Sequence, residues 1–144
     1  MSDRPILLVE DSENDIELTL AALSAHVANH VDVARDGEEA LDYLLCRGAF
    51  ASRKSGAPVL VMLDLKMPKV DGLEVLRTIK ADPALKLLPV VVLTSSREQR
   101  DVVKSYELGV NAYVVKPVEF EQFVEAVKQL GLFWLLVNEP PPMA

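Results

Sequence analysis

The chain has 144 residues, of which 50% are hydrophobic and 26% are charged, and this length suits one domain with a substantial core. The formal net charge is −7, which disfavours a protein whose main partner is nucleic acid, because phosphate binding needs a basic surface. A lone cysteine, Cys46, excludes an internal disulfide and favours a cytoplasmic location. No apolar stretch approaches the ~20 residues that a membrane-spanning helix needs, so we expect no membrane segment.

Short apolar runs alternate with amphipathic stretches along the chain. Through the first half, the pattern predicts a strand at residues 6–9, a helix that Ser12 caps and that reaches Val27, a strand at 31–34, a helix that Asp36 caps, and a strand at 59–63. In the second half it predicts a helix from Asp71 to a stop at Asp82, a strand at 90–93, a helix from about 98 to 108 ended by Gly109, a strand at 112–115, and a helix bearing apolar residues at 120–127.

Five consecutive strand–helix units predict an α/β fold, with an open, doubly wound parallel sheet and helices on both of its faces. The one longer loop in this pattern, residues 47–58, is too short to separate two domains. We therefore expect residues 1–144 to form a single domain.

Charged and hydroxyl side chains stand at the predicted strand ends. Glu10 and Asp11 follow the first strand, Asp64 follows the third, and Thr94 and Lys116 follow the fourth and fifth. Ligands of such sheets bind beyond the carboxyl ends of the strands. Three carboxylates in one crevice repel each other unless a hard cation such as Mg²⁺ joins them, and with the lysine their formal charge is −2, which one divalent ion cancels. Such a pocket suits a phosphoryl group.

Each of these acids taken alone has a simpler interpretation. Acidic residues often follow strands, where they are structural or merely solvated. The joint arrival of the whole set at one sheet edge favours a functional site over that interpretation.

Several segments resemble the signature of response-regulator receiver domains. They are residues 7–11, 64–68 with 71–72, 94–95 and 116–117, in the order and at the spacing of that family. The resemblance covers about residues 5–130 and implies a flavodoxin-like (βα)5 fold with strand order 2-1-3-4-5. It further implies a two-component signalling role, with Asp64 accepting a phosphoryl group from a histidine kinase.

The same resemblance implies roles for the surrounding residues. Asp11 and Asp64 would bind Mg²⁺ through their side chains, Lys66 through its backbone carbonyl, and Glu10 through water. Thr94 would then hydrogen-bond the phosphoryl oxygens.

Two further features of the resemblance concern the end of the fifth strand. Lys116 would pair with the phosphoryl oxygens, aimed by a cis peptide bond to Pro117. Tyr113 resembles the switch aromatic of receivers and would change the face formed by the fourth helix, fifth strand and fifth helix; the alternative is an ordinary aromatic on a half-exposed strand.

The C-terminal residues 131–144 form an apolar and proline-rich extension. Residues 133–135 and 138–141 resemble the ending of small response regulators that pair with phytochrome-type histidine kinases, and such relatives form homodimers through the fourth-helix, fifth-strand, fifth-helix face. We expect the extension to add to that contact. The alternative is that it folds back as a buried strand.

These observations predict a phosphoacceptor signalling protein, limited to self-phosphorylation and autodephosphorylation, and not an enzyme. One alternative is a Mg²⁺-dependent phosphohydrolase with Asp64 as nucleophile, although hydrolases of the haloacid type carry a second aspartate where this chain has Lys66. The other is a receiver-fold interaction module that works without phosphorylation.

Overall fold

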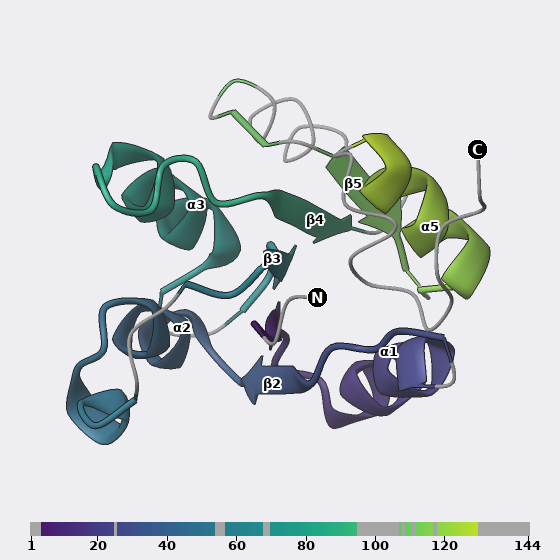
Figure 1. The fold of residues 1–144 in the computed structure, drawn as a ribbon, viewed down its shortest axis with the longest axis horizontal. Coiled ribbons are helices and arrows are strands. Elements are labelled where there is room, and N and C mark those ends of the chain that lie inside the picture. The colour runs from purple at the N-terminus through teal and green to yellow at the C-terminus, as the bar shows by residue number, and fades with distance from the viewer. Residues whose placement is uncertain are drawn as a thin grey trace, which may run out of the picture.

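A parallel sheet forms the centre of the fold (Figure 1). The computed structural model describes residues 4–24, 26–53, 57–67, 70–94, 107, 109–110, 112–116 and 118–129. Within these residues, five strands pair in the order β2-β1-β3-β4-β5, as the resemblance to receiver domains implies. They are β1 (Ile6–Val9), β2 (Val31–Ala34), β3 (Leu60–Asp64), β4 (Val90–Thr94) and β5 (Ala112–Val115).

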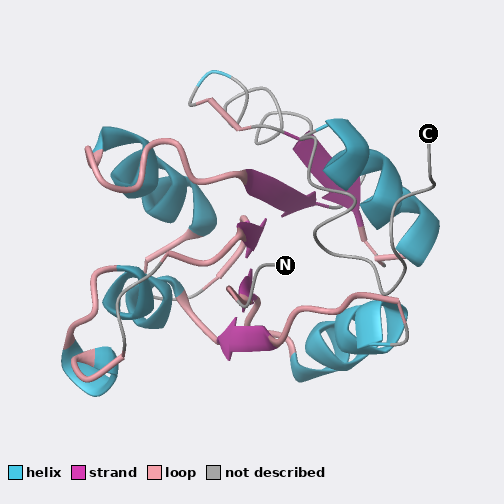
Figure 2. Cartoon of the chain, in the orientation of Figure 1, coloured by secondary structure: helices cyan, strands magenta, loops and turns pink. Residues whose placement is uncertain are grey.

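Helices cover both faces of the sheet. The described ones are α1 (Glu13–Ser24), α2 (Gly37–Leu44), the short 3₁₀ helix η1 (Gly48–Phe50), α3 (Gly72–Ala81) and α5 (Phe120–Gln129). Helices α2 and α3 lie on one side, and α1 and α5 on the other (Figure 2). The helix predicted at about 98–108 falls almost wholly outside the described residues. None of the described helices has the length and apolar character needed to span a membrane.

The core consists of two apolar layers, one on each face of the sheet. Strand β1 contributes to both, because Ile6 and Leu8 pack toward α1 and α5, while Leu7 and Val9 pack toward α2 and α3. All four side chains are fully buried. A continuous apolar run is what a parallel strand covered on both faces requires, so the interpretation of residues 6–9 is confirmed.

Local hydrogen bonds fix the starts of α2 and α3, the first of them at its predicted cap, Asp36. The Asp36 carboxylate accepts from the Glu39 N–H at 2.7 Å, and Glu39 in turn accepts from the Arg35 N–H at 3.3 Å. Asp71 caps α3 by accepting from the Glu74 N–H at 3.0 Å. The bonds to Asp36 and Asp71 satisfy N–H groups that a helix leaves unpaired at its first turn.

Several predicted boundaries differ from the structure. Strand β3 runs from Leu60 to Asp64, one residue later than the predicted 59–63, and β4 continues one residue further than predicted, to Thr94. Asp64 pairs in register with Leu93 and Thr94 with Val115. Helix α1 ends at Ser24, so Val27 lies beyond it, although its side chain is still buried.

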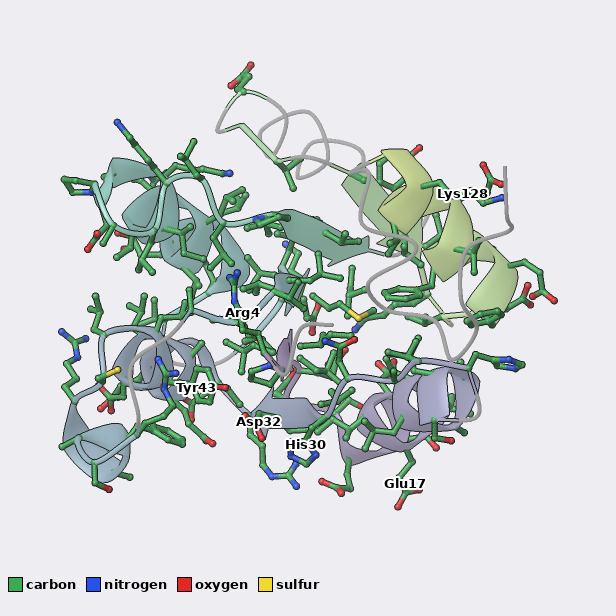
Figure 3. All side chains as sticks on the ribbon, in the orientation of Figure 1. Arg4, Glu17, His30, Asp32, Tyr43 and Lys128 are labelled. Carbon is green, nitrogen blue, oxygen red and sulfur yellow. The ribbon has the colours of Figure 1, made fainter. Side chains whose placement is uncertain are left out.

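The edge strand β2 is held to α2 by polar contacts. Tyr43 donates a hydrogen bond from its hydroxyl to Asp32 at 2.6 Å, and Nε2 of His30 lies 2.9 Å from the other oxygen of Asp32 (Figure 3). The guanidinium of Arg53 lies 4.2 Å from the centroid of the Tyr43 ring. Burial, followed by the bond to Asp32, raises the pKa of Tyr43, so the phenol remains a hydrogen-bond donor.

Candidate functional site

Three carboxylates meet at the carboxyl edge of the sheet. Glu10 follows β1 directly and Asp64 is the last residue of β3, and β1 and β3 are neighbours in the sheet. Ligand oxygens of Glu10, Asp11 and Asp64 all lie within 4.8 Å of one another. Glu10 is fully buried, Asp64 is 4% exposed and Asp11 is open to solvent. The structure therefore brings together the acids that the sequence singled out.

A close backbone approach holds Asp64 at this edge. A Cβ atom on Gly72 would lie only 2.2 Å from the carbonyl oxygen of Asp64 and 2.5 Å from Cα of Leu65, so the start of α3 packs directly against the end of β3. The Gly72 N–H donates to the Leu65 carbonyl at 3.0 Å. The Lys66 N–H donates to Oδ1 of Asp64 at 3.2 Å, which orients the carboxylate.

Lys116 supplies the positive charge of the cluster. Its Nζ lies 2.8 Å from Oε1 of Glu10, 3.2 Å from Oδ2 of Asp64 and 3.1 Å from Oδ2 of Asp15. Sequence reasoning did not find Asp15, which α1 contributes. Three carboxylates contact the ammonium, those of Glu10, Asp15 and Asp64, and Asp11 lies beside Glu10 and Asp64. With Asp15 included, the formal charge of the four acids and the lysine is −3, where the sequence suggested −2 for three acids and the lysine. One divalent ion leaves a negative charge in this pocket.

The environment of this cluster shifts the pKa values of Glu10 and Lys116. Burial, followed by the hydrogen-bonding proximity of Asp64, raises the pKa of Glu10 to about 7. Burial by itself would lower the pKa of Lys116, but Glu10, Asp64 and Asp15 outweigh it and raise this pKa. Lys116 is therefore an ammonium at all physiological pH values, whereas Glu10 can take a proton near neutrality when no metal is bound.

The donor set suits a hard divalent cation. Oε2 of Glu10 accepts from the Ser12 N–H at 3.2 Å, while the buried Oε1 accepts no hydrogen bond of good geometry from the described residues. A buried carboxylate beside two further carboxylates is a typical arrangement for an oxygen-ligated ion. The residues present therefore fit the divalent metal that the fold implies.

Other predicted site residues are placed only in part. Thr94 ends β4 next to the cluster strands, but its side chain lies outside the described residues. Tyr113 projects from β5 and is 43% exposed. Lys66 is exposed and follows β3 closely. The bond to Pro117 and the extension at residues 131–144 also lie outside the described residues.

The strand order and the acidic cluster at the carboxyl edge are those of flavodoxin-like receiver domains. Residues 6–128 match the family model described as "Response regulator receiver domain". This match spans most of the chain, and the chain belongs to this family of two-component signalling proteins.

Phytochrome response regulators are among the similar proteins. Response regulator Rcp1 of Synechocystis sp. is 43% identical over 131 residues, which cover 90% of this chain and 88% of Rcp1. A solved structure of the bacteriophytochrome response regulator AtBRR is 61% identical, with a TM-score of 0.87, over 96% of this chain and 100% of that one. The phosphorylated cyanobacterial phytochrome response regulator RcpA is 42% identical, with a TM-score of 0.76, over 96% and 100%.

Metal binding is also recorded among these similar proteins. A crystal structure of Rcp1 is described as its Mn(2+)-bound form; it is 40% identical to this chain, with a TM-score of 0.75, over 96% of this chain and 99% of that one. Receiver domains bind a divalent metal, and the acidic cluster at residues 10, 11 and 64 is the corresponding feature here.

Proposed function

We propose that Asp64 is the phosphoacceptor of this response regulator and that Mg²⁺ is its metal. The observation that carries the proposal is the position of Asp64, a nearly buried carboxylate 3.2 Å from a lysine ammonium and beside two further metal-suited carboxylates. An oxygen of Asp64 attacks phosphorus, the bond from phosphorus to the donor's histidine nitrogen breaks, and its electron pair leaves on the imidazole. The product is an aspartyl phosphate.

The surrounding residues make this attack possible by lowering charge repulsion. Asp11 and Asp64 would hold the ion through their carboxylates, Lys66 through its carbonyl and Glu10 through water. When bound, Mg²⁺ supplies positive charge toward the phosphoryl oxygens. Lys116 offsets the charge of the same oxygens from the β5 side, because its ammonium already lies within ion-pair distance of Asp64.

The signal then passes to the surface around β5. Thr94 is proposed to bind the phosphoryl oxygens and Tyr113 to turn inward in response. Support comes from the exposed position of Tyr113, which also lines a groove of about 470 Å³ between β5 and α5, together with Glu121, Glu125 and Ala126. A groove beside the switch residue offers a surface whose shape can follow its rotation.

The partner kinase is proposed to be of the phytochrome type, because the similar proteins include response regulators of phytochromes. We further propose a single cytoplasmic domain over residues 1–144 that forms a homodimer, with residues 131–144 adding to the contact. The dimer face would comprise β5, α5 and the helix predicted at about 98–108. Light scattering with and without a phosphoryl mimic tests the dimer. A monomer under both conditions at high concentration would contradict it.

The proposed chemistry stops at self-phosphorylation and slow autodephosphorylation. Incubation with Mg²⁺ and acetyl phosphate should add one phosphoryl mass to the protein, and Asp64→Asn should add none. Asp71→Asn is the matched control, since it changes the same charge at a helix cap and should label normally. Rapid turnover of many phosphate esters per chain would instead favour a phosphohydrolase, and absence of labelling in the native protein would favour a phosphorylation-independent module.

A further inference from the structure

Asp15 lies in the phosphoacceptor pocket although it belongs to neither a strand end nor the metal cluster. Its Oδ2 accepts a hydrogen bond from Nζ of Lys116 at 3.1 Å. The contact of the same ammonium with Oε1 of Glu10 has ion-pair distance, at 2.8 Å, but that oxygen accepts no well-oriented hydrogen bond from the described residues. Asp15 is therefore the contact by which α1 holds the ammonium of Lys116.

The backbone around Asp15 is fixed by the same pocket. The Ser12 N–H donates to Oε2 of Glu10 at 3.2 Å, and the Ser12 hydroxyl accepts from the Asp15 N–H at 3.2 Å. With the two contacts of Lys116, these bonds close a ring that runs from Glu10 through Ser12, Asp15 and Lys116 back to Glu10. A shift of the Lys116 ammonium therefore changes its contact with Glu10, which precedes α1, and its contact with Asp15 in the first turn of α1.

We propose that Asp15 is a positioning residue that holds Lys116 toward α1 and thereby restrains phosphorylation of Asp64. The inference rests on the proposed phosphoacceptor role of Asp64. When the phosphoryl group arrives, its oxygens compete with Asp15 for the ammonium of Lys116. The carboxylate of Asp15 also leaves the metal-loaded pocket with a net negative charge, which repels an anionic donor but attracts a divalent cation.

Asp15 is proposed to slow phosphorylation but to strengthen metal binding. These opposite effects distinguish the proposal from a purely structural role of Asp15. Asp15 lies in the first turn of α1, where an acidic side chain also stabilises the helix dipole. If Asp15 acted only on helix stability, its neutralisation would not accelerate phosphorylation. If it restrains Lys116, its neutralisation should accelerate phosphorylation and weaken metal binding.

The test uses the full chain with Asp15→Asn and measures two quantities. The first is the rate at which acetyl phosphate labels Asp64 at saturating Mg²⁺. In this reaction an oxygen of Asp64 bonds to phosphorus, the phosphorus–oxygen bond to acetate breaks, and acetate leaves with the electron pair. The second is the dissociation constant of Mg²⁺ by calorimetry without donor. The contact is partly solvated, since the Asp15 side chain is 32% exposed, so we expect labelling faster and Mg²⁺ binding weaker by about three- to tenfold each.

Glu13→Gln is the matched control. Glu13 stands in the same turn and loses the same charge, but it is paired with Arg35 at 3.0 Å and is 66% exposed. We expect it to change either quantity by less than about twofold, as for an exposed pair. Asp15→Glu keeps the charge and should restore the native rate and affinity in large part.

The outcomes distinguish a failure of the phosphoacceptor role of Asp64 from a failure of the role of Asp15 alone. A native protein that is not labelled on Asp64 overturns both the phosphoacceptor role and the inference. A native protein that is labelled, with Asp15→Asn equal to Glu13→Gln or slower than the native rate, overturns the role of Asp15 alone.

Discussion

Replacing Lys116 with methionine would leave the carboxylates of the cluster without their cation. In the metal-free protein, Glu10 is fully buried and Asp64 nearly so, and both lie within 3.2 Å of the lysine nitrogen. Removing one member of a fully buried ion pair destabilises a protein by about 3–5 kcal/mol. The Lys116 side chain is 22% exposed, so solvent screens part of this effect, and we expect a loss of about 2–3 kcal/mol at pH 8 in the presence of EDTA.

Urea unfolding measures this loss. For a chain of this size the dependence of the unfolding free energy on urea is about 2 kcal/mol per molar, so the midpoint should fall by ~1–1.5 M. Saturating Mg²⁺ should stabilise Lys116→Met more than the native protein, because it replaces the missing positive charge. At pH 6 the loss should shrink, because Glu10, with a pKa of about 7, is then mostly protonated.

Lys86→Met provides the control. It makes the same change of net charge at an exposed lysine. If Lys116→Met loses no more stability than Lys86→Met at pH 8 in EDTA, or if Mg²⁺ stabilises both variants equally, the lysine does not balance the buried acids and the reasoning is refuted.

Two further predictions concern Glu10 and Gly72, which lie next to Asp64. In the metal-free protein the pKa of Glu10 near 7 lies above its ordinary 4.5, so the folded state holds a proton that the unfolded state releases. Stability should therefore fall by up to about 3 kcal/mol as the pH rises from roughly 5 to 8, and Glu10→Gln should flatten this slope in thermal or urea unfolding; an unchanged slope would contradict the shift. Gly72→Ala should destabilise the protein by about 1–3 kcal/mol despite the better helix propensity of alanine, because its Cβ meets the Asp64 carbonyl. Thr78→Ala in the same helix is the control, and equal stability of the two variants would disprove the close approach.

The strands and helix caps could be predicted because they depend on neighbouring residues. Strand β1 is a continuous apolar run, and the cap at Asp36 needs only an N–H three residues away. Strand ends were less accurate, because the pairing of Asp64 with Leu93 depends on a distant strand and leaves no local signal. The strand order came from a family resemblance, since the sequence pattern alone leaves the order open.

The site residues at strand ends could be predicted, because sheet topology fixes where they lie. A site residue on a helix could not, because its role depends on the direction of its side chain. Residues that end parallel strands must share one sheet edge, so Glu10, Asp64 and Lys116 were found. Asp15 was missed because it stands on a helix, where an acidic residue in the first turn is ordinary. Glu13 stands in the same turn and turns away to Arg35. The available signal was the position of Asp15 in the first turn of the helix that begins directly after Glu10 and Asp11, close in the chain to the predicted cluster.

The central claim, that Asp64 accepts the phosphoryl group, is tested most directly by locating the label. The native protein is incubated with Mg²⁺ and acetyl phosphate, digested, and its peptides are fragmented in a mass spectrometer. We predict a phosphoryl mass on Asp64 that requires Mg²⁺ and is lost from Asp64→Asn. A label on any other residue, or equal labelling of Asp64→Asn, would contradict the account.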